Sequence, residues 1–161
     1  MIAKKVLLVG NFGVGKTSLI RRFVLNQFAE DYISTIGVRV SAKVVQYENT
    51  AIKLLIWDVA GTSGDEKIPK AYFLGASAAM FVFDVSRIET YLNIDHHLES
   101  IKTLSGLQNI TIVGNKKDLL TQEELQLVVE RVSVNIDLIT SAKEDENVEN
   151  AFLELASQAI K

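Results

Sequence analysis

A glycine-rich loop near the N-terminus carries the clearest chemical signal in the sequence. It fits the pattern G-x-x-x-x-G-K-[ST] and reads Gly10-Asn11-Phe12-Gly13-Val14-Gly15-Lys16-Thr17. Glycines let such a loop wrap a phosphate with its N–H groups turned inward, and a helix that starts there adds partial positive charge. Lys16 would reach the β- and γ-phosphates, and the Thr17 hydroxyl would bind Mg²⁺. The loop therefore predicts a nucleotide site, with contacts from Asn11, Phe12, Gly13, Val14, Gly15, Lys16, Thr17 and Ser18.

Two later segments indicate which base the nucleotide carries. Asn115-Lys116-Lys117-Asp118 follows one strand pattern, and Thr140-Ser141-Ala142-Lys143 follows the next. The Asp118 carboxylate can accept hydrogen bonds from N1–H and the 2-amino group of guanine, whereas adenine would leave this charge unpaired. Asn115 can donate to N7, the Ala142 N–H can meet O6, and the Lys116 stem can lie on the base. We expect guanine contacts from Asn115, Lys116, Asp118, Ser141, Ala142 and Lys143.

A third segment, Asp58-Val59-Ala60-Gly61, also follows a strand pattern. An aspartate at this position suits an indirect role in Mg²⁺ binding, in which it orients the direct ligands of the ion, and Gly61 can present its N–H to a γ-phosphate. The alternative is a strand-ending aspartate followed by a turn glycine. Residues 27–37 are polar and end in glycine, which is typical of a mobile surface loop.

The elements that position these residues are short apolar runs alternating with longer amphipathic ones. The expected strands are Val6–Val9, Val38–Tyr47, Ile52–Trp57, Met80–Phe83, Ile110–Val113 and Ile136–Ile139, and the second and third form a hairpin through Glu48-Asn49-Thr50. The expected helices are Lys16–Asn26, Tyr91–Leu104, Gln122–Val132 and Val148–Ile160. This alternation predicts an α/β fold with a mainly parallel sheet, helices on both faces and ligands at the carboxyl ends of the strands.

Composition narrows the class of protein. The 161 residues are 48% hydrophobic and 23% charged, which predicts one globular domain over residues 1–161. The absence of cysteine excludes disulfides, thiolate metal sites and catalytic thiols. A net charge of −3 argues against nucleic acid as a partner. Without a targeting or membrane-spanning segment, and with no cysteine to carry a lipid anchor, we expect a cytoplasmic location.

The motifs together resemble those of a small GTPase of the Ras superfamily, and their sequences are most similar to those of the Rab branch. The resemblance covers Lys5 to Ala159 and rests on Gly10–Thr17, Ser34-Thr35-Ile36-Gly37, Trp57–Gly61, Asn115–Asp118 and Thr140–Lys143. It implies a P-loop NTPase G domain, with a six-stranded sheet, one antiparallel edge strand and five helices. It implies GTP or GDP as the bound nucleotide, with Mg²⁺. Because the chain stops at Lys161 without a tail, either a tail was removed or the protein works in solution, as a prokaryotic relative would.

The resemblance also implies roles for residues that their own patterns leave open. Thr35 would complete the Mg²⁺ shell with Thr17 and Asp58, and Tyr32 would be a further nucleotide contact. Phe28 would pack edge-on against guanine, although by itself it is read equally well as a core aromatic. Loss of the γ-phosphate would release Thr35 and Gly61 and relax residues 28–38 and 61–75. These two segments would bind protein effectors and regulators, and the protein would be a monomer.

Two positions depart from the family pattern. Thr62 stands where most relatives carry a glutamine that orients the attacking water, and its shorter side chain predicts slow hydrolysis. Phe12 stands where relatives carry a small residue, so its ring either crowds the γ-phosphate or points outward. The expected catalytic set is Lys16, Thr35, Gly61 and Thr62. We expect a slowly hydrolysing GTP-dependent switch; the alternatives are a GTP-holding scaffold with negligible turnover and, disfavoured by Asp118 and Ala142, an ATP-using phosphotransferase.

Overall fold

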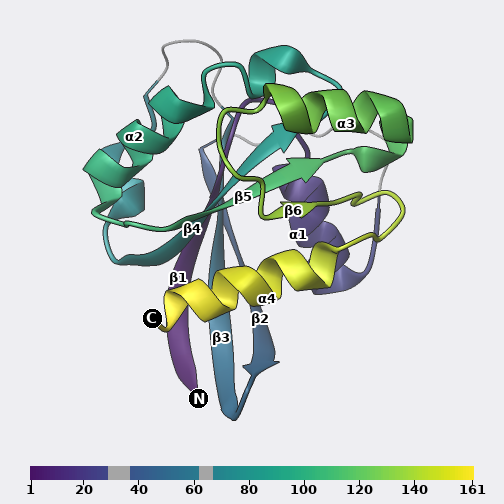
Figure 1. Cartoon of the computed structure of the whole chain (residues 1–161). Helices are drawn as coiled ribbons and strands as arrows, with labels where there is room; N and C mark the ends of the chain where they lie inside the picture. Colours follow the sequence, from purple (N-terminus) through teal and green to yellow (C-terminus); the bar gives the residue numbers. More distant parts are fainter. Residues whose placement is uncertain (29–36, 62–66) are drawn as a thin grey trace.

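The computed structural model describes residues 1–28, 37–61 and 67–161 and contains a six-stranded sheet (Figure 1). The order across the sheet is β2-β3-β1-β4-β5-β6. All neighbouring strands are parallel except β2 and β3, which form the hairpin at the edge. The strands are β1 (Ile2–Val9), β2 (Val38–Tyr47), β3 (Thr50–Val59), β4 (Ala76–Asp84), β5 (Ile110–Asn115) and β6 (Leu138–Ile139). The predicted α/β class, strand count and antiparallel edge are confirmed.

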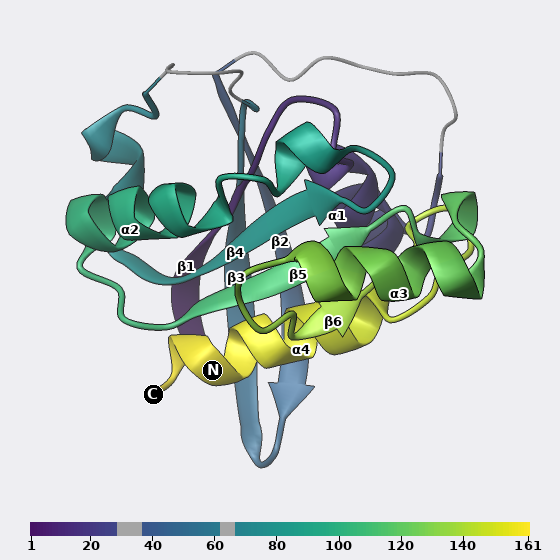
Figure 2. The same cartoon turned by 45° about the horizontal axis from the view of Figure 1, so that its top comes forward.

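Four α-helices cover the sheet within the described residues: α1 (Lys16–Leu25), α2 (Ile94–Ser105), α3 (Gln122–Arg131) and α4 (Val148–Ala159). Helices α1 and α4 cover one face of the sheet, and α2 and α3 cover the other (Figures 1 and 2). Their buried side chains accordingly belong to two separate clusters. Thr121 caps α3, since its side chain accepts a hydrogen bond from the Glu124 N–H.

Three details differ from the expectation. The described residues contain four α-helices rather than five, and between β3 and β4 they contain only a 3-10 helix, η1 (Lys70–Phe73), bounded by Pro69 and Leu74. Helix α2 begins at Ile94 rather than at Tyr91, because residues 91–93 form a turn that follows another 3-10 helix, η2 (Ile88–Thr90). Strand β6 is shorter because the Asp137 side chain, rather than a strand backbone, accepts from the N–H of Ile112.

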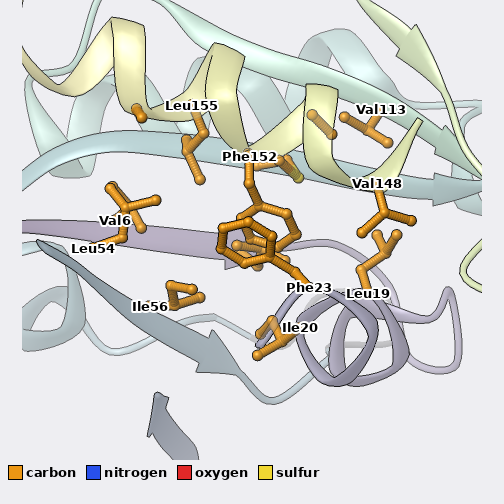
Figure 3. Close-up of a cluster of buried hydrophobic side chains, with 14 of the residues drawn as sticks. Val6, Leu19, Ile20, Phe23, Leu54, Ile56, Val113, Val148, Phe152 and Leu155 are labelled. Carbon is orange, nitrogen blue, oxygen red and sulfur yellow. The ribbon is translucent and has the colours of Figure 1, made fainter. Parts of the chain in front are cut away.

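The apolar run at the end of β1 is covered on both faces, as predicted. Val6 and Leu8 belong to the buried cluster under α1 and α4, and Leu7 and Val9 belong to the cluster under α2. In the first cluster, Phe23 of α1 and Phe152 of α4 stack with ring centroids 4.0 Å apart and an interplanar angle of 4° (Figure 3). This stack holds the helix that follows the glycine loop against the C-terminal helix.

Strand register brings the predicted site residues to one edge of the sheet. Asp58 of β3 pairs with Leu8 of β1, so it lies beside the start of the glycine loop. Asp84 of β4 pairs with Asn115 of β5. Within the residues that the structure describes, no helix is long and apolar enough to cross a lipid bilayer.

Candidate functional site

The glycine loop joins β1 directly to α1, and its glycines are needed where the chain comes closest to neighbouring segments. Gly10 has a φ of 151°, and a Cβ there would lie 2.1 Å from the carbonyl oxygen of Val82. Gly15 has a φ of 101°, and a Cβ there would lie 2.3 Å from Nδ2 of Asn115. Only glycine fits such positions without strain. The loop therefore lies against β4 on one side and against the Asn115 segment on the other.

The Lys16 side chain folds back over this loop. Its ammonium donates to the carbonyl oxygens of Gly10, at 3.0 Å, and Asn11, at 3.1 Å, and the residue is only 5% exposed. Burial lowers the pKa of the Lys16 ammonium to about 8, against a smaller opposing effect of the Asp58 carboxylate. A desolvated cation at the centre of a loop at a helix N-terminus is suited to hold phosphate oxygens.

Two oxygen-bearing side chains meet beside the lysine. The Thr17 hydroxyl donates to Oδ2 of Asp58 at 2.5 Å, which joins the first turn of α1 to the end of β3. Asp58 is 3% exposed. Hydroxyl and carboxylate oxygens that complement nucleotide phosphates are the ligands that Mg²⁺ takes, so this pair fits a bound magnesium.

The Asn115 side chain connects the glycine loop with the segment after β6. Its Nδ2 donates to the carbonyl oxygen of Val14 at 3.0 Å. Its Oδ1 accepts from the Thr140 hydroxyl at 3.0 Å and, over a longer 3.4 Å, from the Ala142 N–H. Asn115 is 1% exposed, so these bonds are shielded from water. One of its two amide hydrogens is thus used within the protein.

Asp118 lies on the exposed side of the same segments, held by a hydroxyl. The Ser141 hydroxyl donates to Oδ1 of Asp118 at 2.7 Å and accepts from the Glu144 N–H at 3.0 Å. Ser141 also forms a two-hydrogen-bond bridge with the backbone of Glu146. The predicted base-reading carboxylate is therefore oriented by the segment that follows β6, while its side chain faces solvent.

Lys116 is positioned by a residue that the sequence analysis missed. Its backbone is left-handed, with a φ of 68°, and its ammonium lies 3.1 Å from Oδ2 of Asp84. Asp84 is 1% exposed, and its Oδ1 accepts from the N–H and the hydroxyl of Ser86. The available signal was an acidic residue ending an apolar run on the site edge of the sheet, because buried charges are paired.

Gly61 lies in contact with the glycine loop, as its predicted role requires. A Cβ on Gly61 would lie 2.5 Å from Cα of Phe12 and 2.6 Å from its nitrogen. Phe12 remains 45% exposed, which favours the outward alternative, and its carbonyl accepts from Nη1 of Arg87 at 3.1 Å. The N–H of Ala60 donates to the carbonyl oxygen of Gly37 at 2.8 Å. This bond joins the end of the predicted loop 28–38 to the residue just before the predicted loop 61–75.

The remaining predicted residues lie either next to or outside the residues that the structure describes. Tyr32, Thr35 and Thr62 lie outside the described residues. Phe28 is half-buried and packs against the cluster under α1 and α4, which agrees with its reading as a core aromatic. Arg22, which is not among the predicted site residues, contacts the segment after β6.

Comparison with known proteins gives one family and a set of plant relatives. Residues 5–161 match the family model described as "Ras family". The chain is 39% identical over 163 residues to the Ras-related protein RABA1h of Arabidopsis thaliana, covering 98% of this chain and 74% of the relative. It is 38% identical over 164 residues both to the Ras-related protein RIC2 of Oryza sativa subsp. japonica and to RABA1f of Arabidopsis thaliana, covering 98% of this chain and 75% of each. These relatives give no support to a prokaryotic origin.

Proposed function

The chain belongs to the Ras family of small GTPases, and we propose that residues 1–161 form one GTP-binding domain that hydrolyses GTP slowly without a partner. Members of the family bind guanine nucleotide and hydrolyse GTP, so this protein is a GTPase and a nucleotide-dependent switch. Membership favours this reading over a scaffold that holds GTP without turnover. The observation that carries the proposed site is the Asn115 side chain, which joins the phosphate-binding loop at Val14 to the base-reading residue Ala142.

Different residues of the chain would contact different parts of the nucleotide. The loop N–H groups and Lys16 would hold the phosphates, since Lys16 needs to give up only two carbonyl contacts to reach them. Asp118 would accept from N1–H and the 2-amino group of guanine, and the Ala142 N–H would donate to O6. Lys116, held by Asp84, would lie along the base.

Magnesium would bind at the Thr17 hydroxyl oxygen, which Asp58 orients by accepting its hydrogen bond, with Thr35 as a further ligand in the GTP state. When bound, the ion neutralises negative charge on the β- and γ-phosphate oxygens. Lys16 and the N–H of Gly61 would contact the γ-phosphate from the protein side. Water attacks the γ-phosphorus and the bond to the β–γ bridging oxygen breaks, which releases phosphate and leaves GDP.

Thr62 is the reason to expect slow turnover. A threonine hydroxyl is too short to orient the water and contact the γ-phosphate as a glutamine amide does. A protein partner would supply the missing group. Such partners and effectors would bind residues 28–38 and 61–75, and the Ala60–Gly37 hydrogen bond supports the idea that these segments respond together. We propose that the protein acts as a monomer with no nucleic-acid partner.

The test is single-turnover release of γ-phosphate from protein preloaded with GTP and Mg²⁺, followed over hours without a partner. We expect slow first-order release and faster release after Thr62→Gln, whereas Phe12→Gly should change the rate little because the Phe12 ring is exposed. The control for guanine specificity compares how well excess GDP and excess ADP compete with the bound nucleotide for the site. Stable GTP in all variants would support the scaffold instead, and equal competition by ADP would overturn guanine specificity.

A further inference from the structure

The Arg22 side chain connects two parts of the site, the helix that follows the phosphate-binding loop and the segment after β6. Arg22 lies on α1, the helix that begins at Lys16, and its side chain crosses to the base loop (residues 140–143). Its Nε donates to the carbonyl oxygen of Ala142 at 2.8 Å, and its Nη2 donates to that of Lys143 at 2.9 Å. A third donor, Nη1, lies 3.4 Å from Oδ1 of Asn26 at the end of the same helix. A planar guanidinium with donors to two successive carbonyls holds both peptide groups in one orientation.

The helix that carries Arg22 is itself held firmly. Leu19, Ile20 and Phe23 of α1 are buried, and Phe23 stacks on Phe152 of α4 (Figure 3). Asn26 ends the helix with a left-handed backbone, φ 53°, and its N–H donates to the carbonyl of Arg22. The rotation of α1 about its axis is therefore set by packing on one side. This places the Arg22 side chain in register with the base loop.

The rest of the base loop is held at other points. Thr140 bonds through its backbone to Gly114 and to Lys117, and Ser141 bonds to Glu146. None of these bonds involves the carbonyl groups of Ala142 or Lys143, to which Arg22 donates. Arg22 thus holds the Ala142–Lys143 peptide group through its carbonyl. The Ala142 N–H that is predicted to read O6 belongs to the adjoining peptide group, on the other side of the Ala142 Cα, and lies 3.4 Å from Oδ1 of Asn115.

We propose that Arg22 is a positioning residue that directs the Ala142 N–H to O6 of guanine and couples the phosphate-binding helix to base recognition. This inference rests on the proposed function, because it assumes that Ala142 reads O6. Its specific consequence is that Arg22 matters to the O6 contact and much less to the contact that Asp118 makes with the 2-amino group. A residue that merely stabilised the fold would affect both contacts alike.

The experiment measures the affinities and dissociation rates of four nucleotides with Mg²⁺: GDP, 6-thio-GDP, IDP and, as the test of guanine recognition itself, ADP. In 6-thio-GDP the O6 acceptor is replaced by sulfur, a weak acceptor, while IDP lacks only the 2-amino group. We expect Arg22→Gln to raise the GDP dissociation rate roughly tenfold or more, the change expected from losing a charge-assisted hydrogen bond. The preference for GDP over 6-thio-GDP should shrink, whereas the preference for GDP over IDP should stay as in the wild type.

Two further variants keep the result interpretable. Arg22→Lys retains the charge and one donor direction but loses the planar fork, so its effect should be intermediate. Arg21→Gln changes the same residue type one position earlier on α1, about 100° around the helix, and should behave as wild type. Among the described residues no hydrogen bond joins the Arg21 side chain to the base loop.

The outcomes separate the inference from the proposed function. If the wild type binds GDP no better than ADP, guanine recognition itself is wrong and the inference fails with it. If the wild type prefers GDP to ADP but Arg22→Gln leaves the ratio of the affinities for GDP and 6-thio-GDP unchanged, the inference alone is overturned. The inference would also be overturned if Arg22→Gln reduced the preference for GDP over 6-thio-GDP and the preference for GDP over IDP equally. Such a result would indicate that the whole base site had loosened.

Discussion

The Asn115 side chain donates to the backbone carbonyl of Val14 at 3.0 Å, and this bond joins the base-reading segment to the phosphate-binding loop. The two residues are 101 positions apart in the chain. The same side chain accepts from Thr140 and Ala142. One buried amide thus ties together three segments that must act on one nucleotide.

Replacing the donor of this bond should weaken nucleotide binding. Asn115→Asp keeps an acceptor for Thr140 but places a carboxylate oxygen against the Val14 carbonyl. We expect GDP affinity to fall more than tenfold and the free energy of unfolding to fall by about 1–3 kcal/mol, the usual cost of an unpaired buried polar group. Calorimetric titration and urea unfolding would measure the two effects. The exposed Asn150→Asp on α4 is the matched control, and equal behaviour of both variants would contradict the role of Asn115.

Nucleotide affinity should depend on pH through Lys16. Burial lowers the pKa of this ammonium to about 8 in the free protein, and bound phosphates would raise it. Below pH 8 the lysine is already protonated in both states, so affinity is constant. Above pH 8 binding must take up a proton, and GDP affinity should fall about tenfold from pH 7 to pH 9.

The control for this pH dependence is Lys16→Arg. Its guanidinium does not titrate below pH 12, so its GDP affinity should be lower but independent of pH over the same range. Titrations in two buffers of different ionisation enthalpy would count the protons directly. A wild-type affinity that is flat between pH 7 and pH 9 would show that Lys16 keeps its charge in the free protein.

Asp118→Asn should change which base is bound. An asparagine amide presents one acceptor and one donor, which matches the N1–H and 2-oxo group of xanthine better than the two donors of guanine. GDP affinity should fall more than tenfold and the affinity for xanthosine diphosphate should rise. Competition binding with both nucleotides measures the exchange of preference. An unchanged order of preference would mean that Asp118 does not read the base.

The Phe23–Phe152 stack should contribute strongly to stability. Phe152 is fully buried, so Phe152→Ala should lower the free energy of unfolding by about 3–5 kcal/mol. Leu127→Ala on α3, where the side chain is 49% exposed, should stay within about 0.5 kcal/mol of wild type. Urea unfolding followed by Trp57 fluorescence measures both. Equal midpoints for the two variants would show that the stack is dispensable.

Local patterns in the sequence were enough to predict the architecture and the residue types of the site. A continuous apolar run marked β1, the turn Glu48-Asn49-Thr50 marked the β2–β3 hairpin, and the glycine loop marked the phosphate site. Each of these signals depends on steric and hydrophobic preferences of neighbouring residues. The edge of the sheet where the motifs meet also followed, because parallel strands end at a common edge.

Contacts between distant side chains were beyond the reach of such patterns. Arg22 reaches Ala142 across 120 positions only because α1 packs on α4 at one rotation. Asp84 holds Lys116 only because the register of β4 on β5 places Asp84 beside Asn115. Helix rotation and strand register are set by packing over the whole core, so they appear in the folded chain and leave no local periodicity in the sequence.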